Sequence, residues 1–202
     1  EFRRVLFRSG IADFIAAEEL GRQRGFWWAP DGSELLVQSI DESPVQVQWI
    51  SDPATPTTAP REQRYPAAGT NNAVVGLHLV SRDGSRKAVS WDPDTYEYLV
   101  SVTWQSGHRP LITLASRDQR RFTSLTIESS GDLVIVLDLH DDQFLEVIPG
   151  QPRWLDGHLV TVRDGGLPDE HRECRLRRCL DTARDVEHEL AHVPLLTPPN
   201  TR

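Results

Sequence analysis

Two adjacent glutamates, Glu18 and Glu19, are the residues of this sequence best suited to recognising a charged ligand. They end a short helical pattern in which Asp13 suits the N-cap and Gly21 suits the C-terminal stop. Both carboxylates fall in the last turn, where the helix dipole disfavours negative charge. Neighbouring helical positions point about 100° apart, so the pair can flank a small cation such as a peptide α-ammonium group. A solvated acidic surface is the alternative explanation of the same two residues.

A second group of residues lies near the C-terminus, where His188, Glu189 and His192 match the H-E-x-x-H pattern of zinc peptidases. Pro194 would end such a helix, and no third ligand follows among the last ten residues. Cys174 and Cys179, with His171 nearby, lack the further ligands that a zinc knuckle needs. We therefore expect neither a metal nor another cofactor, and a zinc metallopeptidase is the least favoured function.

Composition excludes several classes of protein. The chain has 202 residues and a formal net charge of −8, which argues against a nucleic-acid partner. It contains no apolar run long enough to span a membrane. Lys87 is the only lysine among 22 basic residues, which indicates a GC-rich coding sequence and a bacterial source. The compartment stays open between the cytoplasm and the cell envelope.

Short β-strands dominate the sequence between Phe26 and Val162. Glycine, proline or aspartate bounds most of the apolar runs, and no helix-length period separates them, which excludes a parallel α/β sheet. The echo of Trp28-Ala29-Pro30-Asp31 in Trp91-Asp92-Pro93-Asp94 favours a β-propeller over a sandwich or barrel. The predicted strands are Glu34–Ile40, Val45–Ile50, Val74–Val80, Arg86–Val89, Tyr98–Trp104, Pro110–Ser116, Thr123–Ser129, Leu133–Asp138 and Phe144–Ile148.

Four motifs, in order and at characteristic spacing, connect these elements to a known family. They are Asp13–Leu20, Gly25–Gly32, Asp41–Val45 and Arg64–Asn71. Together they resemble the N-terminal β-propeller domain of dipeptidyl peptidase IV-type serine peptidases, of the prolyl oligopeptidase superfamily. The resemblance implies an all-β fold: a partial β-propeller of antiparallel four-stranded blades, with a short helical insertion that carries Glu18 and Glu19.

The resemblance also implies a function for the glutamate pair. In that family the pair binds the free N-terminus of a peptide substrate, so that an exopeptidase releases dipeptides; Glu18 and Glu19 occupy the matching positions. It implies structural roles for Trp27 and Trp28, one between blades and one near the glutamate helix, and for Arg64-Tyr65-Pro66. Tyr65 facing a central cavity is an open alternative.

Catalysis in that family requires an α/β-hydrolase domain with a G-x-S-x-G nucleophile elbow. No serine of this chain has glycine at both of those positions. We therefore expect a fragment that is inactive alone, whose partners are peptide substrates and the hydrolase domain of the same polypeptide. A homodimer of the full-length protein is a further expectation, and a non-catalytic interaction scaffold is the alternative function.

The two ends differ from the middle of the sequence. Residues 1–9 resemble one reading frame of a common short-read sequencing adapter, and we expect them to be foreign to the natural protein. Residues 10–163 form the expected partial propeller. Residues 164–202 are dense in charge and contain both cysteines, and fit either a helical extension or a shifted reading frame.

Overall fold

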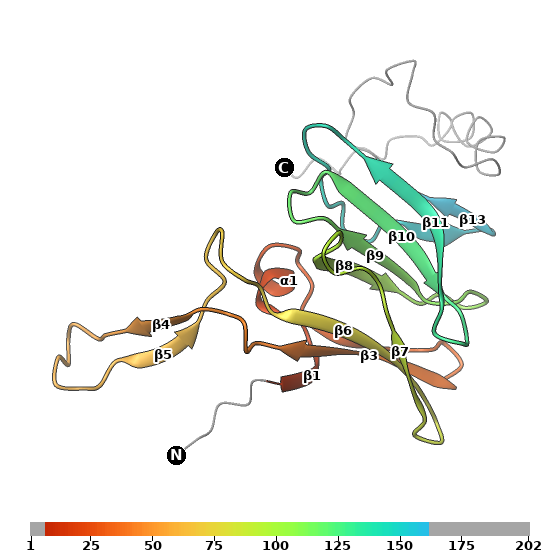
Figure 1. Cartoon of the computed structure of the whole chain (residues 1–202). Coiled ribbons are helices and arrows are strands. Elements are labelled where there is room, and N and C mark those ends of the chain that lie inside the picture. Colours follow the sequence, from red (N-terminus) through yellow and green to blue (C-terminus); the bar gives the residue numbers. More distant parts are fainter. Residues whose placement is uncertain (1–6, 162–202) are drawn as a thin grey trace, which may run out of the picture.

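Two antiparallel β-sheets that share a core form most of this computed structural model, which describes residues 7–161 (Figure 1). The first sheet contains β1 (Phe7–Ile11), β2 (Arg24–Trp28), β3 (Glu34–Asp41), β6 (Val74–Ser81) and β7 (Arg86–Val89). The second contains β8 (Tyr98–Thr103), β9 (Leu111–Ala115), β10 (Arg121–Ile127) and β11 (Leu133–His140). Two hairpins pair β4 (Val47–Ile50) with β5 (Arg61–Arg64), and β12 (Arg153–Leu155) with β13 (His158–Val160).

Each large sheet contains a four-stranded meander, β2-β3-β6-β7 in one and β8-β9-β10-β11 in the other. Neighbouring strands are antiparallel, and tight turns such as Asp31-Gly32 and Asp83-Gly84 connect them, with a positive φ at both glycines. This arrangement confirms the predicted partial β-propeller with four-stranded blades. β1 adds to the first sheet by pairing first with β3 and then, at Gly10 and Ile11, with β2.

Apolar side chains from both sheets form one core cluster. Trp27, Leu36 and Leu79 of the first sheet pack in it with Leu99 and Ile112 of the second. Burying each such side chain stabilises the fold by about 1.5–3 kcal/mol. Trp27 belongs to this cluster, which confirms the expectation that one tryptophan lies between blades. Trp28 follows it on β2 and faces the other way, because successive side chains of a strand alternate between faces.

The strand prediction fails in two ways. Phe144–Ile148 was predicted as a strand but is irregular, because Leu145 and Val147 pack against the second sheet without joining a ladder. No strand was predicted at β1, β2, β5, β12 or β13. β5 has the polar sequence Arg-Glu-Gln-Arg and pairs only with β4, so it carries no apolar alternation to detect.

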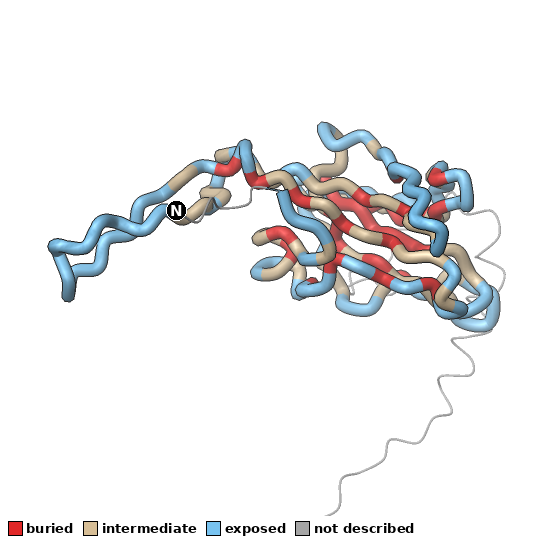
Figure 2. The backbone as a smooth tube through the Cα atoms, turned by 90° about the horizontal axis from the view of Figure 1, so that it is seen from below, coloured by how far each residue is buried: buried red, intermediate tan, exposed pale blue. Residues whose placement is uncertain are grey.

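The β4–β5 hairpin forms an arm that projects from the body of the two sheets (Figure 2). Its residues are mostly exposed, and neither strand contributes to a core cluster. Arg64 closes the base of the arm by donating hydrogen bonds to the carbonyl oxygens of Glu42, Ser43 and Val45. Tyr65 packs edge-on against Phe14 with 5.2 Å between ring centroids. These contacts agree with the structural role expected for Arg64 and Tyr65.

One short helix, α1 (Phe14–Glu18), joins β1 to β2. It has five residues, and residues 7–161 contain no helix with the length and apolar character of a membrane span.

Candidate functional site

Helix α1 carries the two glutamates and starts as the sequence predicts. The Asp13 carboxylate caps it by accepting a hydrogen bond from the Ala16 backbone N–H at 3.2 Å. The Glu19 N–H donates to the Ile15 carbonyl at 2.9 Å, and Gly21 follows with a φ of 64°. A helix this short is not stable in isolation, so its conformation depends on contacts with the rest of the molecule.

Glu18 ends α1 and Glu19 is its C-cap residue. Both side chains are exposed, and no hydrogen bond or ion pair joins either carboxylate to another residue within 7–161. The last turn contains no basic residue to offset their charge. Two carboxylates at the negative end of a helix dipole create a local potential that attracts a small cation.

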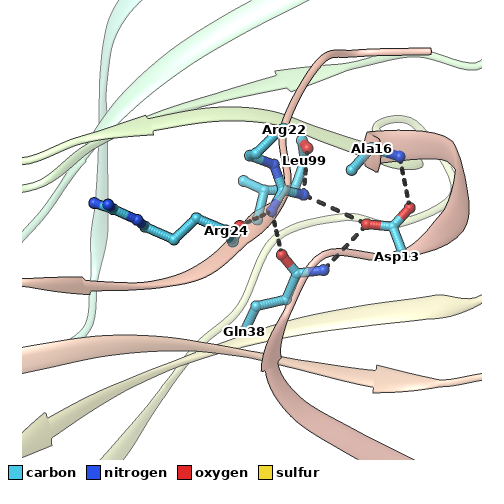
Figure 3. Close-up of polar contacts among 6 residues, drawn as sticks. All are labelled: Asp13, Ala16, Arg22, Arg24, Gln38 and Leu99. Atoms are coloured by element: carbon cyan, nitrogen blue, oxygen red, sulfur yellow. Dashed lines mark hydrogen bonds and ion pairs between the residues drawn. The ribbon is translucent and has the colours of Figure 1, made fainter. Parts of the chain in front are cut away.

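Arg22, three residues after Glu19 in the sequence, is the centre of a buried polar cluster (Figure 3). Its Nη2 donates to the Leu99 carbonyl at 2.9 Å and lies 3.4 Å from the Asp13 carboxylate. Its Nη1 donates to the Arg24 carbonyl at 2.8 Å and to the Gln38 side-chain oxygen. Gln38 in turn donates to the Asp13 carboxylate at 3.1 Å, so the cluster joins α1, β2, β3 and β8.

Burial is the main electrostatic effect in this cluster. Arg22 is 91% buried by its side-chain surface, and this desolvation lowers its pKa, whereas the negative charge of Asp13 raises it. A guanidinium group removed from water requires hydrogen-bonding partners, and four acceptors serve the two terminal nitrogens of Arg22, whereas its Nε is buried without a partner among residues 7–161. The ion pair therefore fixes geometry, while its net contribution to folding is small.

Apolar contacts hold the same segment from its other sides. Leu20 packs against the core cluster of Val100, Ala115 and Phe122 on the second sheet. Phe14 contacts Tyr65 at the base of the arm. The glutamate pair is thus exposed on a segment that is fixed on both sides.

Gly21, two residues after Glu19 in the sequence, is one of the residues that line an open groove of about 470 Å³. Trp27, Trp28 and Trp104 line it. Trp28 is 57% exposed, so it belongs to a groove wall beside the glutamate segment rather than to the core.

Sequence reasoning did not single out Arg22 or Gln38. One signal was present: Gln38 occupies an inward position of β3 between Leu36 and Ile40, and all three are fully buried. A polar side chain at such a position needs a buried partner. Nothing comparable marks Arg22, which lies in a connecting segment.

The alternative zinc ligands His171, Cys174, Cys179, His188, Glu189 and His192 all lie outside the described residues. Within residues 7–161, no three His, Cys, Asp or Glu side chains are grouped so that they could hold a metal ion.

Comparison with known proteins places the chain in a family. A sequence model described as "Dipeptidyl peptidase IV (DPP IV) N-terminal region" matches residues 4–158. The chain is 31% identical over 177 residues to "Inactive dipeptidyl peptidase 10" of Mus musculus, covering 81% of this chain and 22% of that protein. It is 26% identical over 194 residues to "Venom dipeptidyl peptidase 4" of Apis mellifera, covering 80% of this chain and 25% of that protein.

A solved structure shows the same fold. The crystal structure of Porphyromonas gingivalis dipeptidyl peptidase 4 aligns with a TM-score of 0.62 and 23% identity, over 70% of this chain and 21% of that one. The chain thus spans about a quarter or less of the length of these relatives. The match of the family model over most of the chain shows that it belongs to the dipeptidyl peptidase IV N-terminal family.

Proposed function

We propose that this chain is the substrate-recognition part of a serine dipeptidyl peptidase, in which Glu18 and Glu19 bind the free α-ammonium group of a peptide. One observation carries the proposal: two exposed carboxylates, with no cationic partner among residues 7–161, lie on a segment that is held on both sides. Membership of the dipeptidyl peptidase family supports it.

The chemistry follows from the geometry of an ammonium group. Its three N–H donors and single positive charge can bind one oxygen of each carboxylate, and each charge-assisted hydrogen bond contributes about 1.5–3 kcal/mol. An anchored N-terminus places the peptide bond after the second residue at a fixed distance from the catalytic nucleophile, so dipeptides are released. The nucleophile belongs to a hydrolase domain, and we expect this chain alone not to hydrolyse peptides.

A non-catalytic interaction scaffold is the second candidate. The similarity to a relative named as inactive favours it, because the propeller can persist in this family where catalysis does not. A scaffold of this kind does not need to distinguish a free peptide N-terminus from a blocked one.

The test is a binding experiment on the chain itself. The ligand is the tripeptide amide alanyl-prolyl-alanine amide, titrated into ¹⁵N-labelled protein, with its N-acetylated form as the blocked control. We expect the free peptide to shift amide resonances of residues 14–24 and the acetylated peptide to leave them unchanged. Glu18→Gln and Glu19→Gln should each weaken binding about tenfold or more, because each removes one charge-assisted hydrogen bond.

Glu128→Gln is the matched control, since Glu128 is an exposed glutamate in the distant turn between β10 and β11. It should leave the affinity within about twofold of the original chain. Equal binding of the free and acetylated peptides would favour the scaffold, and unchanged affinity in the double glutamine variant would refute the role of the pair.

A further inference from the structure

We propose that Arg22 is a positioning residue that holds Glu18 and Glu19 in the arrangement that binds the ammonium group. The inference rests on the proposed function, and it assigns a role to a residue that never touches the substrate.

The first step of the argument is that both ends of the glutamate segment meet at one ion pair. Asp13 starts the segment as the N-cap of α1, and Arg22 ends it, with Arg22 Nη2 lying 3.4 Å from an Asp13 carboxylate oxygen. The Arg22 backbone N–H also donates to the Ala16 carbonyl at 2.8 Å. The contacts of Asp13 and Arg22 (Figure 3) therefore close residues 13–22 into a loop. Glu18 and Glu19 are exposed residues of this loop.

The second step is that this closed loop is tied to both sheets. Arg22 reaches Gln38 on β3 of the first sheet and the carbonyl of Leu99 on β8 of the second. The register of β8 against β9 shifts between Leu99 and Ser101, so the carbonyl that accepts Arg22 lies at a β-bulge. The orientation of the glutamates is thereby fixed relative to both blades.

The third step concerns the shape of the donor. Two terminal nitrogens of one planar guanidinium group serve four acceptors from four different segments. A lysine ammonium has the same charge but is a compact point donor and cannot span these acceptors. The cluster therefore depends on arginine geometry as well as on positive charge.

The direction of the effect separates positioning from simple electrostatics. Arg22 is a positive charge near a site that binds a cation, so its field alone opposes ammonium binding. Removing that charge without disturbing the glutamates would strengthen binding. If Arg22 positions the pair, removing it weakens binding instead.

The experiment compares Arg22→Gln, Arg22→Lys and the control Arg82→Gln in the full chain, with the same tripeptide amide as the probe. Arg82 is an exposed arginine that donates a hydrogen bond to the Gly32 carbonyl at 2.8 Å. Its replacement therefore removes a positive charge and a backbone contact outside the Arg22 cluster. We expect Arg22→Gln to weaken the affinity at least about tenfold, Arg22→Lys to restore it only in part, and Arg82→Gln to stay within about twofold.

Hydrogen exchange supplies a readout that a general loss of structure would not reproduce. In Arg22→Gln, amides of residues 14–22 should exchange faster while those of β9 and β10 keep their protection. Uniform acceleration, unchanged or tighter binding in Arg22→Gln, or complete rescue by lysine would each overturn the inference.

A second variant covers the case in which Arg22→Gln does not fold. Asp13→Asn keeps an acceptor for the N-cap but removes the ion pair, so it should weaken binding several-fold; affinity within twofold would overturn the inference. Failure of the proposed function gives a different result: the unmodified chain would then bind the free and the acetylated peptide equally. In that case the role proposed for Arg22 would also be refuted.

Discussion

At the scale of single residues, a close approach of two backbone segments constrains the start of the site. Gly25 lies where β1 passes β2, paired with Gly10. A Cβ atom at Gly25 would lie 2.2 Å from the Ile11 carbonyl oxygen, with two further Ile11 backbone atoms at 2.4 Å. Ile11 is two residues before the helix cap Asp13, so this crossing sets where α1 begins.

Gly25→Ala should therefore destabilise the fold by roughly 1–3 kcal/mol, because a backbone segment must shift to admit the methyl group. Urea unfolding monitored by tryptophan fluorescence measures the change. Gly76→Ala is the control: its nearest neighbour is the Ser39 hydroxyl oxygen at 3.0 Å, which a side-chain rotation can move. Equal stability losses in the two variants would contradict the importance of the crossing.

At the scale of elements, the β4–β5 arm is a local unit that the core does not hold. Its strands pair only with each other, from Val47 with Arg64 to Ile50 with Arg61. An isolated two-stranded hairpin is marginally stable in water. Its attachment at the base therefore decides how often it opens, and Arg64 supplies three hydrogen bonds there.

Arg64→Gln should increase amide exchange in residues 47–50 and 61–64 by about tenfold, since hydrogen bonds from a charged group contribute about 1.5–3 kcal/mol. The urea midpoint of the whole chain should barely move, because β4 and β5 add nothing to the core clusters. Arg61→Gln, on the same strand, removes a contact with Gln63 alone and should leave exchange unchanged. Global destabilisation by Arg64→Gln would show that the arm is coupled to the core.

At the scale of the whole molecule, the sequence predicted what depends on local pattern and missed what depends on long-range contacts. Alternation in β3 and the Asp13 cap were readable directly, and the family motifs indicated the blades. Arg22 was not identified from the sequence, because its partners Gln38 and Leu99 lie 16 and 77 residues away along the chain. β1 was not predicted as a strand, because it lacks alternating hydrophobicity and forms a strand through its pairing with β3 and β2.

Aspartates in the connections between strands make the stability of the whole molecule depend on pH. Seven aspartate carboxylates within residues 7–161 accept a hydrogen bond from the backbone N–H two residues later, at 2.8–3.1 Å, and five of them have a lowered pKa. Hydrogen bonds from neighbouring side chains and N–H groups lower the pKa of each of these five carboxyls below its ordinary value of 3.8. The five residues are Asp31, Asp52, Asp83, Asp92 and Asp118.

A lowered pKa in the folded state means that the unfolded chain binds more protons at acid pH. These aspartates therefore stabilise the fold above a pH of about 4, and the stabilisation disappears as the pH falls through their lowered folded pKa values. The urea midpoint should accordingly decrease between pH 5 and pH 2.5. In the double variant Asp83→Asn/Asp92→Asn, an amide oxygen replaces two of the carboxylates and stays neutral at every pH. Its midpoint should be lower than that of the original chain at pH 6 and should approach it at pH 2.5, giving a shallower acid dependence. An equally steep decrease in both proteins would show that acid acts on this fold through groups other than its turn aspartates.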